Sequence, residues 1–175
     1  HVSDEYDYRE NSIYKTYLAC DAVSDEVLLR NHYRCNKEII GFNNKKYYNS
    51  KLKIQSKSKE PAPLVYMDVK SDNTQIKNTS PAEVEEVVEY ALLNKDKSIA
   101  VITPFVNQKQ LIENAIKQNK LSNLVCGTVH AFQGDEEDVV LFSTAISERT
   151  SSGTYNWLTN NNELITVATS IAKEQ

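Results

Sequence analysis

The chain has 175 residues, of which 40% are hydrophobic, and its 20 basic and 24 acidic side chains give a net charge of −4. This length and composition predict one soluble globular domain, and the net charge gives the whole molecule no basic field that would indicate nucleic acid. A lysine-rich stretch over residues 45–59 could follow a phosphate backbone, but a solvated loop is the favoured interpretation. No apolar run approaches the roughly 20 residues of a membrane helix, and the acidic start is unlike a signal peptide. We therefore expect a cytoplasmic protein with no membrane partner. Three widely spaced cysteines predict neither a disulfide framework nor a zinc site.

The first half of the chain has few regular patterns. Residues 1–24 are acidic and rich in tyrosine, and they are predicted to be a partly ordered lead-in to a single domain over residues 25–175. Short apolar runs predict strands at Val27–Leu29 and Leu64–Val69. A helix is expected to begin after Asn36, which is a suitable N-cap, because apolar residues follow it at helical spacing.

The second half alternates strands with helices. Ser80, Pro81 and Glu83 form a capping-box pattern at the start of a helix. Further helices are predicted over Val106–Gln118 and Glu163–Lys173, and a polar loop over Thr150–Asn162, while apolar runs predict strands over Ser98–Thr103, Leu124–Val129 and Val139–Ala145. Such alternation predicts an α/β fold, with a mainly parallel β-sheet and helices on both faces.

Polar residues follow the predicted strands, where parallel sheets bind their ligands. The segments at these carboxyl ends are Arg30–Arg34, Thr103–Phe105 and Thr128–Glu136. We expect them to gather on one rim of the sheet.

The last of these segments carries a specific motif, Thr-Val-His-Ala-Phe-Gln-Gly-Asp-Glu, between two apolar strands. It resembles motif V of superfamily-1 DNA/RNA helicases, in the branch related to the nonsense-mediated-decay RNA helicase, and so implies a RecA-like fold. The resemblance implies that Thr128 and His130 touch nucleic acid. It implies that Gln133, Gly134 and Glu136 bind ATP, with the carboxylate accepting hydrogen bonds from the ribose. The acids that follow Gly134 lie consecutively on a turn, which favours a solvated turn over a metal site.

Two other strings resemble the same family. A Tyr-Arg pair precedes a helix at Tyr33-Arg34, and in the family the arginine reaches the γ-phosphate of ATP while the tyrosine stacks on the base. The resemblance implies a catalytic role for Arg34 and ATP binding by Tyr33, and an arginine beside a helix start is well placed to bind phosphate. The string Val-Ile-Thr-Pro-Phe resembles the segment that holds the phosphodiester chain. Thr103 and Pro104 are therefore expected to bind nucleic acid, although Thr103 could equally be an N-cap.

The chain departs from the family near its end. Residues 164–173 resemble motif VI, but Ile171 occupies the position of an arginine that stabilises charge on the transferring phosphoryl group. Lys173 is predicted to lie on a different face of the helix. Either ATP is hydrolysed poorly or another residue substitutes for the arginine.

The chain also contains no P-loop sequence. The resemblance, which covers residues 28–173, is to the second, C-terminal RecA-like motor domain, which supplies half of the ATP cleft and part of the single-strand track. It implies two partners, single-stranded nucleic acid, whether DNA or RNA, and an N-terminal RecA-like domain of the same polypeptide. It also implies ATP and Mg²⁺ as cofactors of the full-length protein, with none bound by this domain alone. A non-catalytic module that binds nucleic acid or protein remains an alternative, and a small-molecule enzyme is a third, less favoured one.

Overall fold

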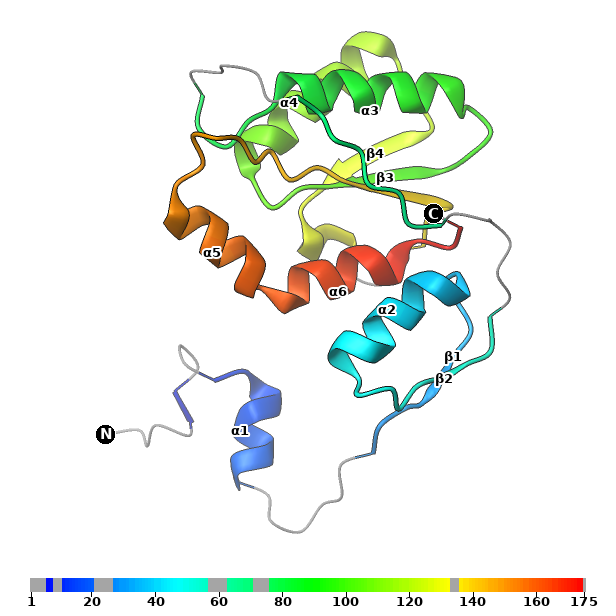
Figure 1. The fold of residues 1–175 in the computed structure, drawn as a ribbon, viewed down its shortest axis with the longest axis vertical. Helices are drawn as coiled ribbons and strands as arrows, with labels where there is room; N and C mark the ends of the chain where they lie inside the picture. Colours follow the sequence, from blue (N-terminus) through cyan, green and yellow to red (C-terminus); the bar gives the residue numbers. More distant parts are fainter. Residues whose placement is uncertain are drawn as a thin grey trace.

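The computed structural model describes residues 6–7, 11–20, 27–56, 63–70, 76–132 and 136–174. Helices pack against two sheets, each made of parallel strands (Figure 1). In chain order the elements are α1 (Ile13–Cys20), β1 (Asn31–His32), α2 (Lys37–Tyr47), β2 (Lys53–Ile54), α3 (Pro81–Leu93), β3 (Ile99–Ile102), α4 (Val106–Asn119), β4 (Leu124–Gly127), the 3₁₀ helix η2 (Val129–Phe132), β5 (Val139–Phe142), α5 (Ser152–Asn160) and α6 (Asn162–Ile171).

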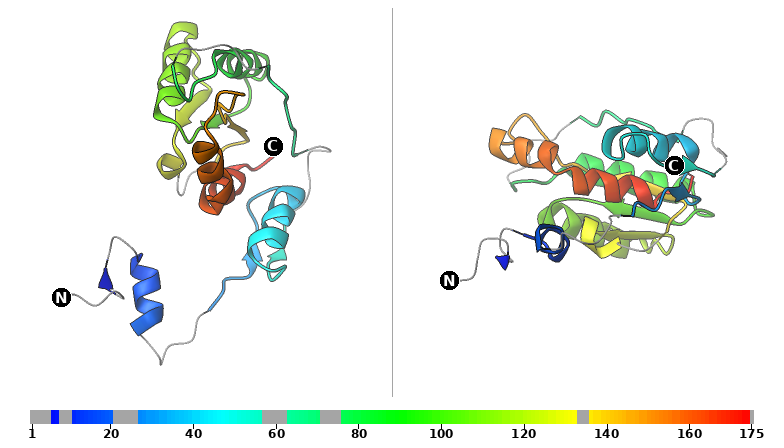
Figure 2. Two further views of the ribbon diagram at one scale, coloured as in Figure 1. Left: turned by 60° about the vertical axis from the view of Figure 1, so that its left-hand side comes forward. Right: turned by 90° about the horizontal axis from the view of Figure 1, so that it is seen from below.

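The larger sheet has the strand order β4-β3-β5, and all its pairings are parallel. Helices α3 and α4 cover one face, and α6 and η2 lie on the other (Figures 1 and 2). The central strand β3 is fully buried, as expected for a parallel strand with helices on both sides. The predicted α/β fold is therefore confirmed.

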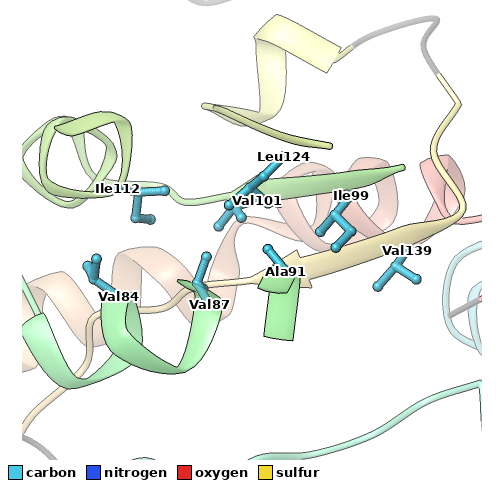
Figure 3. Packing of buried hydrophobic residues seen from close by; sticks show 8 residues of the cluster. All are labelled: Val84, Val87, Ala91, Ile99, Val101, Ile112, Leu124 and Val139. Atoms are coloured by element: carbon cyan, nitrogen blue, oxygen red, sulfur yellow. The ribbon is translucent and has the colours of Figure 1, made fainter. Parts of the chain in front are cut away.

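Two apolar clusters hold these layers together. The first lies between the sheet and the helices α3 and α4 (Figure 3), and consists of Val84, Val87, Ala91, Ile99, Val101, Ile112, Leu124 and Val139. The second joins the opposite face of the sheet to η2, α5 and α6, and includes Ala100, Ile102, Val129, Leu158 and Ile171. Each buried valine or isoleucine contributes about 1.5–3 kcal/mol through burial of its side chain.

Local capping signals in the sequence are confirmed. Asn36 caps α2 by accepting a hydrogen bond from the backbone N–H of Glu38. Ser80 caps α3 in the same way, accepting from the backbone N–H of Glu83 at 3.2 Å. The expected reciprocal bond is replaced, because the Ser80 N–H donates to the Gln108 side chain and leaves the Glu83 carboxylate for another partner.

The two early strand predictions are wrong. Val27–Leu29 and Leu64–Val69 form no strand, and most of their apolar side chains are exposed. A strand needs a partner, and here the pairing forms between β1 and β2, outside both predicted segments. This small sheet lies beside α2, which packs on α6 (Figure 1).

The region predicted to be a polar loop contains α5. Ser151 caps this helix through the backbone N–H of Thr154, and Leu158 anchors it in the core. The lead-in contains α1, which buries none of its residues. Among the helices that the structure describes, none has the length and hydrophobicity required to cross a membrane.

Candidate functional site

The predicted site residues lie at two opposite ends of the larger sheet, so the expectation of a single rim is wrong. Thr103 and Thr128 follow the carboxyl ends of β3 and β4, whereas Glu136 precedes the amino end of β5. Arg34 contacts Glu136 and therefore lies at that amino end as well. The strands are four residues long, which separates the two ends by roughly 10 Å.

At the amino end, two cations share one carboxylate. Arg34 Nε lies 2.6 Å from Glu136 Oε1, and Lys173 Nζ lies 3.7 Å from Glu136 Oε2. The structure thus brings together the arginine expected to reach a phosphate and the carboxylate expected to accept from a ribose. All three side chains remain about 40% exposed. Ion pairs at this exposure stabilise a protein by less than about 1 kcal/mol, so a ligand can displace them at little cost.

The Arg34 backbone is fixed by the residues on either side of it. Cys35 donates its backbone N–H to His32 Nε2 at 3.0 Å and its thiol to the Ser170 carbonyl. Burial raises the pKa of the Cys35 thiol to about 11, against the opposing effect of Arg34, so the thiol stays protonated. Burial, and then the charge of Arg34, lower the pKa of His32, which keeps Nε2 available as an acceptor.

The end of α6 differs from the expectation at two positions. Ile171 is only 2% exposed and packs in the second apolar cluster, so its side chain does not join Arg34 and Glu136. Helix α6 stops at Ile171, and Ala172 has extended backbone angles. Lys173 is therefore not on the helix at all, and the helical argument that placed it on another face does not apply. Its backbone N–H instead donates to Glu137, beside β5.

At the carboxyl end, Gly127 allows η2 to fold tightly back against β4. A Cβ at Gly127 would lie 2.7 Å from the Phe132 ring and 3.0 Å from the Ala131 Cβ. The turn is closed by a hydrogen bond from the Ala131 N–H to the Thr128 carbonyl. Thr128 is partly exposed at this end of the sheet, where a ligand could contact it. The side chain of His130 lies outside the described part of the structure.

Thr103 does not fit the role expected for it. Its side chain is completely buried, and its hydroxyl faces the backbone N–H of Phe105 at 3.4 Å. The N-cap of α4 is Phe105, so Thr103 is not the cap either. In this conformation the Thr103 hydroxyl cannot contact a nucleic acid, and the neighbouring Pro104, which is partly exposed, remains a candidate.

A buried polar network fixes this carboxyl end. Gln108 is fully buried, and its side chain accepts from the Ser80 N–H and donates to the Ser80 carbonyl and the Ser143 hydroxyl. Ser143 in turn donates to Glu83 at 2.6 Å, and the same carboxylate accepts from the Ala145 N–H. The network ties the starts of α3 and α4 to the end of β5, so it holds the backbone that a ligand there would meet.

The amino-end cluster has the groups that a nucleotide requires. Two exposed cations suit a phosphate, and Tyr33, which is 70% exposed, is free to stack on a base. Gln133 and Gly134 lie outside the described residues. Among the residues that the structure describes, no group of three or more His, Cys, Asp or Glu side chains could hold a metal ion. The sequence did not predict that Lys173 joins this cluster. Its position follows from the end of α6 at Ile171, which no local sequence pattern indicated.

Comparison with known proteins gives one family and several relatives. Residues 9–175 match a family model described as an AAA domain. The chain is 30% identical over 144 residues to a "Probable helicase with zinc finger domain" from Homo sapiens. The matched region covers 71% of this chain and 7% of the relative. It is 30% identical to "Helicase sen1" from Schizosaccharomyces pombe over 143 residues (66% of this chain, 8% of the relative) and 24% identical to "RNA helicase Mov10l1" from Mus musculus over 156 residues (74% and 13%). The chain thus spans only a small part of these relatives.

Proposed function

Since the chain belongs to the AAA domain family and is a helicase-like domain, we propose that it is the second, C-terminal RecA-like motor domain of an ATP-dependent superfamily-1 helicase. In this proposal ATP and Mg²⁺ bind between this domain and an N-terminal RecA-like domain of the same polypeptide. The domain supplies half of the ATP cleft and part of a track for single-stranded nucleic acid.

The observation that carries the proposal is the pairing of Arg34 with Glu136 at the amino end of β5. The two residues come from segments far apart in the sequence, and two different motifs of the same family resemblance imply that each touches the nucleotide. Tyr33 extends from the same turn as Arg34 with most of its ring exposed. A base, a ribose and a phosphate would thus each find a suitable group within one small area.

The arginine can serve a phosphate without losing its carboxylate. Its contact with Glu136 uses Nε, and the guanidinium carries four further N–H donors on its two Nη atoms. Lys173 balances the second oxygen of Glu136, so the carboxylate stays paired if Arg34 turns toward the ligand. Charge that develops on a transferring phosphoryl group would then be stabilised by Arg34.

The opposite end of the sheet is proposed to face the nucleic acid. Pro104 and Thr128 are partly exposed there, and the residues that precede them are joined by a hydrogen bond from the Thr103 N–H to the Gly127 carbonyl. His130 is retained as a proposed contact because of the motif it belongs to. A movement of the two motor domains against each other would then carry the strand along.

The proposal is tested in the full-length protein by replacing Arg34 with alanine. We expect ATP turnover to fall by at least about 100-fold, and affinity for a non-hydrolysable ATP analogue to fall more than affinity for ADP, because the γ-phosphate contact is lost. Arg30→Ala is the matched control, since Arg30 is an exposed arginine of the same segment with no described partner for its side chain. Equal nucleotide affinities and rates in the two variants would refute the proposed role.

A second candidate function, a non-catalytic helicase-like binding module, is favoured by Ile171. The residue replaces the arginine of motif VI and is buried, so no arginine reaches the cleft from this position. The two candidates differ in one measurement. A full-length protein that binds single strands but hydrolyses no ATP would be the binding module, and the isolated domain is expected to lack ATPase activity in either case.

A further inference from the structure

An exposed aromatic residue, Trp157, lies next to the segment proposed to hold nucleic acid. It is the one tryptophan of the chain, it lies on α5, and 47% of it is exposed. Its ring packs against Phe105, with 6.2 Å between the ring centroids and 41° between the ring planes. Phe105 is itself buried and directly follows Thr103 and Pro104 at the carboxyl end of β3. The contact therefore holds an exposed indole at that end of the sheet.

The surroundings of the ring suit the phosphates of a nucleic acid. Helix α5 contains no charged residue, so no carboxylate of this helix repels an approaching strand. Helix α4 begins at Val106, and its N-cap Phe105 makes no side-chain cap hydrogen bond, so no cap side chain competes with an anion for the N–H groups of the first turn. Lys77 is exposed and is tied to the same helix start, because its carbonyl accepts from the Asn107 side chain at 3.1 Å.

We infer that Trp157 is a stacking platform for an unpaired base of a single strand whose phosphates lie at the start of α4. The inference rests on the proposed function and adds to it a specific base contact outside the helicase motifs. Aromatic rings stack on any base, so the contact would hold a strand without reading its sequence. Packing against Phe105 keeps the indole in place before the strand arrives.

The test is a titration of the full-length protein with a single-stranded DNA oligonucleotide and with an RNA of the same sequence. Trp157→Ala is expected to weaken binding of at least one of them by about 5- to 150-fold, the range for stacking one base on an aromatic ring. Trp157→Phe keeps an aromatic ring and should retain most of the affinity. Quenching of tryptophan fluorescence on binding should be smaller in Trp157→Phe than in the wild-type protein.

Two controls separate stacking from other effects. Tyr155→Ala removes another exposed ring from the same helix, and among the described residues this ring makes no aromatic contact with Phe105, so the variant should leave affinity unchanged. An oligonucleotide of abasic sites keeps the phosphates but has no bases, so Trp157→Ala should not alter its binding. Thermal unfolding of each variant checks that α5 remains folded.

The outcomes distinguish this inference from the proposed function. If the wild-type protein binds oligonucleotides and Trp157→Ala binds them equally well, the stacking role is refuted. The helicase assignment then stands, and a protein partner becomes the alternative ligand for the exposed indole. If the variant weakens binding to the abasic strand as much as to the normal one, the effect is not stacking and the inference also fails. If the wild-type protein binds no strand at all, the proposed nucleic-acid function fails too.

Discussion

Ile171 provides a direct test of how α6 is placed. The side chain is 2% exposed and packs with residues of β3, η2 and α5 in the second apolar cluster. Replacing a buried isoleucine with alanine removes favourable burial and leaves a cavity, which together lower the free energy of unfolding by about 2–5 kcal/mol. In a protein of this length each kcal/mol lowers the Tm by about 2–4 °C. We therefore expect Ile171→Ala to lower the Tm by roughly 4–20 °C.

Thermal unfolding followed by circular dichroism measures this change. Ile165→Ala is the matched control, since it makes the same substitution on the same helix at a position that is only partly buried. Its effect should be smaller by at least about half. A Tm shift in Ile171→Ala that is below about 2 °C, or below that of the control, would refute the burial of Ile171.

Ile171→Arg tests whether position 171 is buried, as in the structure, or faces the nucleotide, as the resemblance to motif VI implies. A buried guanidinium without a partner is destabilising by several kcal/mol, comparable with the whole stability of a typical domain. We expect this variant to unfold at a lower temperature than Ile171→Ala and to bind ATP no more tightly than the wild-type protein. A stable Ile171→Arg protein with raised ATP turnover would show that position 171 faces the nucleotide after all.

Three further changes test other parts of the site. Gln108→Leu should lower the free energy of unfolding by about 2–4 kcal/mol, because it leaves the buried partners of Gln108 without hydrogen bonds. Gln118 is exposed on the same helix, so Gln118→Leu should leave the free energy of unfolding nearly unchanged. In the full-length protein Lys173→Met should weaken binding of an ATP analogue by about 2- to 5-fold, because Glu136 then holds Arg34 more tightly. Lys97, which pairs with Glu174 instead, is the control, and equal weakening by Lys97→Met would contradict this reason. Because the folded protein lowers the pKa of His32, the unfolded chain binds the proton more readily below the ordinary value of about 6.5. The stabilising effect of His32 should therefore be complete above that value and be lost as the pH falls through the folded-state pKa; an NMR titration midpoint at or above 6.5 would contradict this.

The parts of the fold that the sequence predicted are those set by local chemistry. The caps at Asn36 and Ser80 act within three residues, so their patterns predicted the starts of α2 and α3. Helix α5 was missed because its glycine, threonine and asparagine residues have low helix propensity, and it is held by a single buried leucine and a capping serine. The strands predicted at Val27–Leu29 and Leu64–Val69 failed for the opposite reason, since apolar residues alone do not provide a pairing partner.

The sequence named individual candidate site residues but did not predict how they are arranged in space. Nothing in the sequence near Arg34 indicates a contact with Glu136, because that contact depends on α2 packing against α6. Burial of Thr103 likewise depends on tertiary packing, which local patterns do not record. The motif resemblance grouped these residues without showing that they divide between two ends of a sheet.

That division also applies within the segment that resembles motif V. The motif begins at Thr128, at the carboxyl end of β4, and ends at Glu136, at the amino end of β5, on the other side of β3. Both strands run in the same direction, so Thr128 and Glu136 lie at opposite ends of the sheet. One short segment therefore joins the end proposed to face nucleic acid to the end proposed to face ATP.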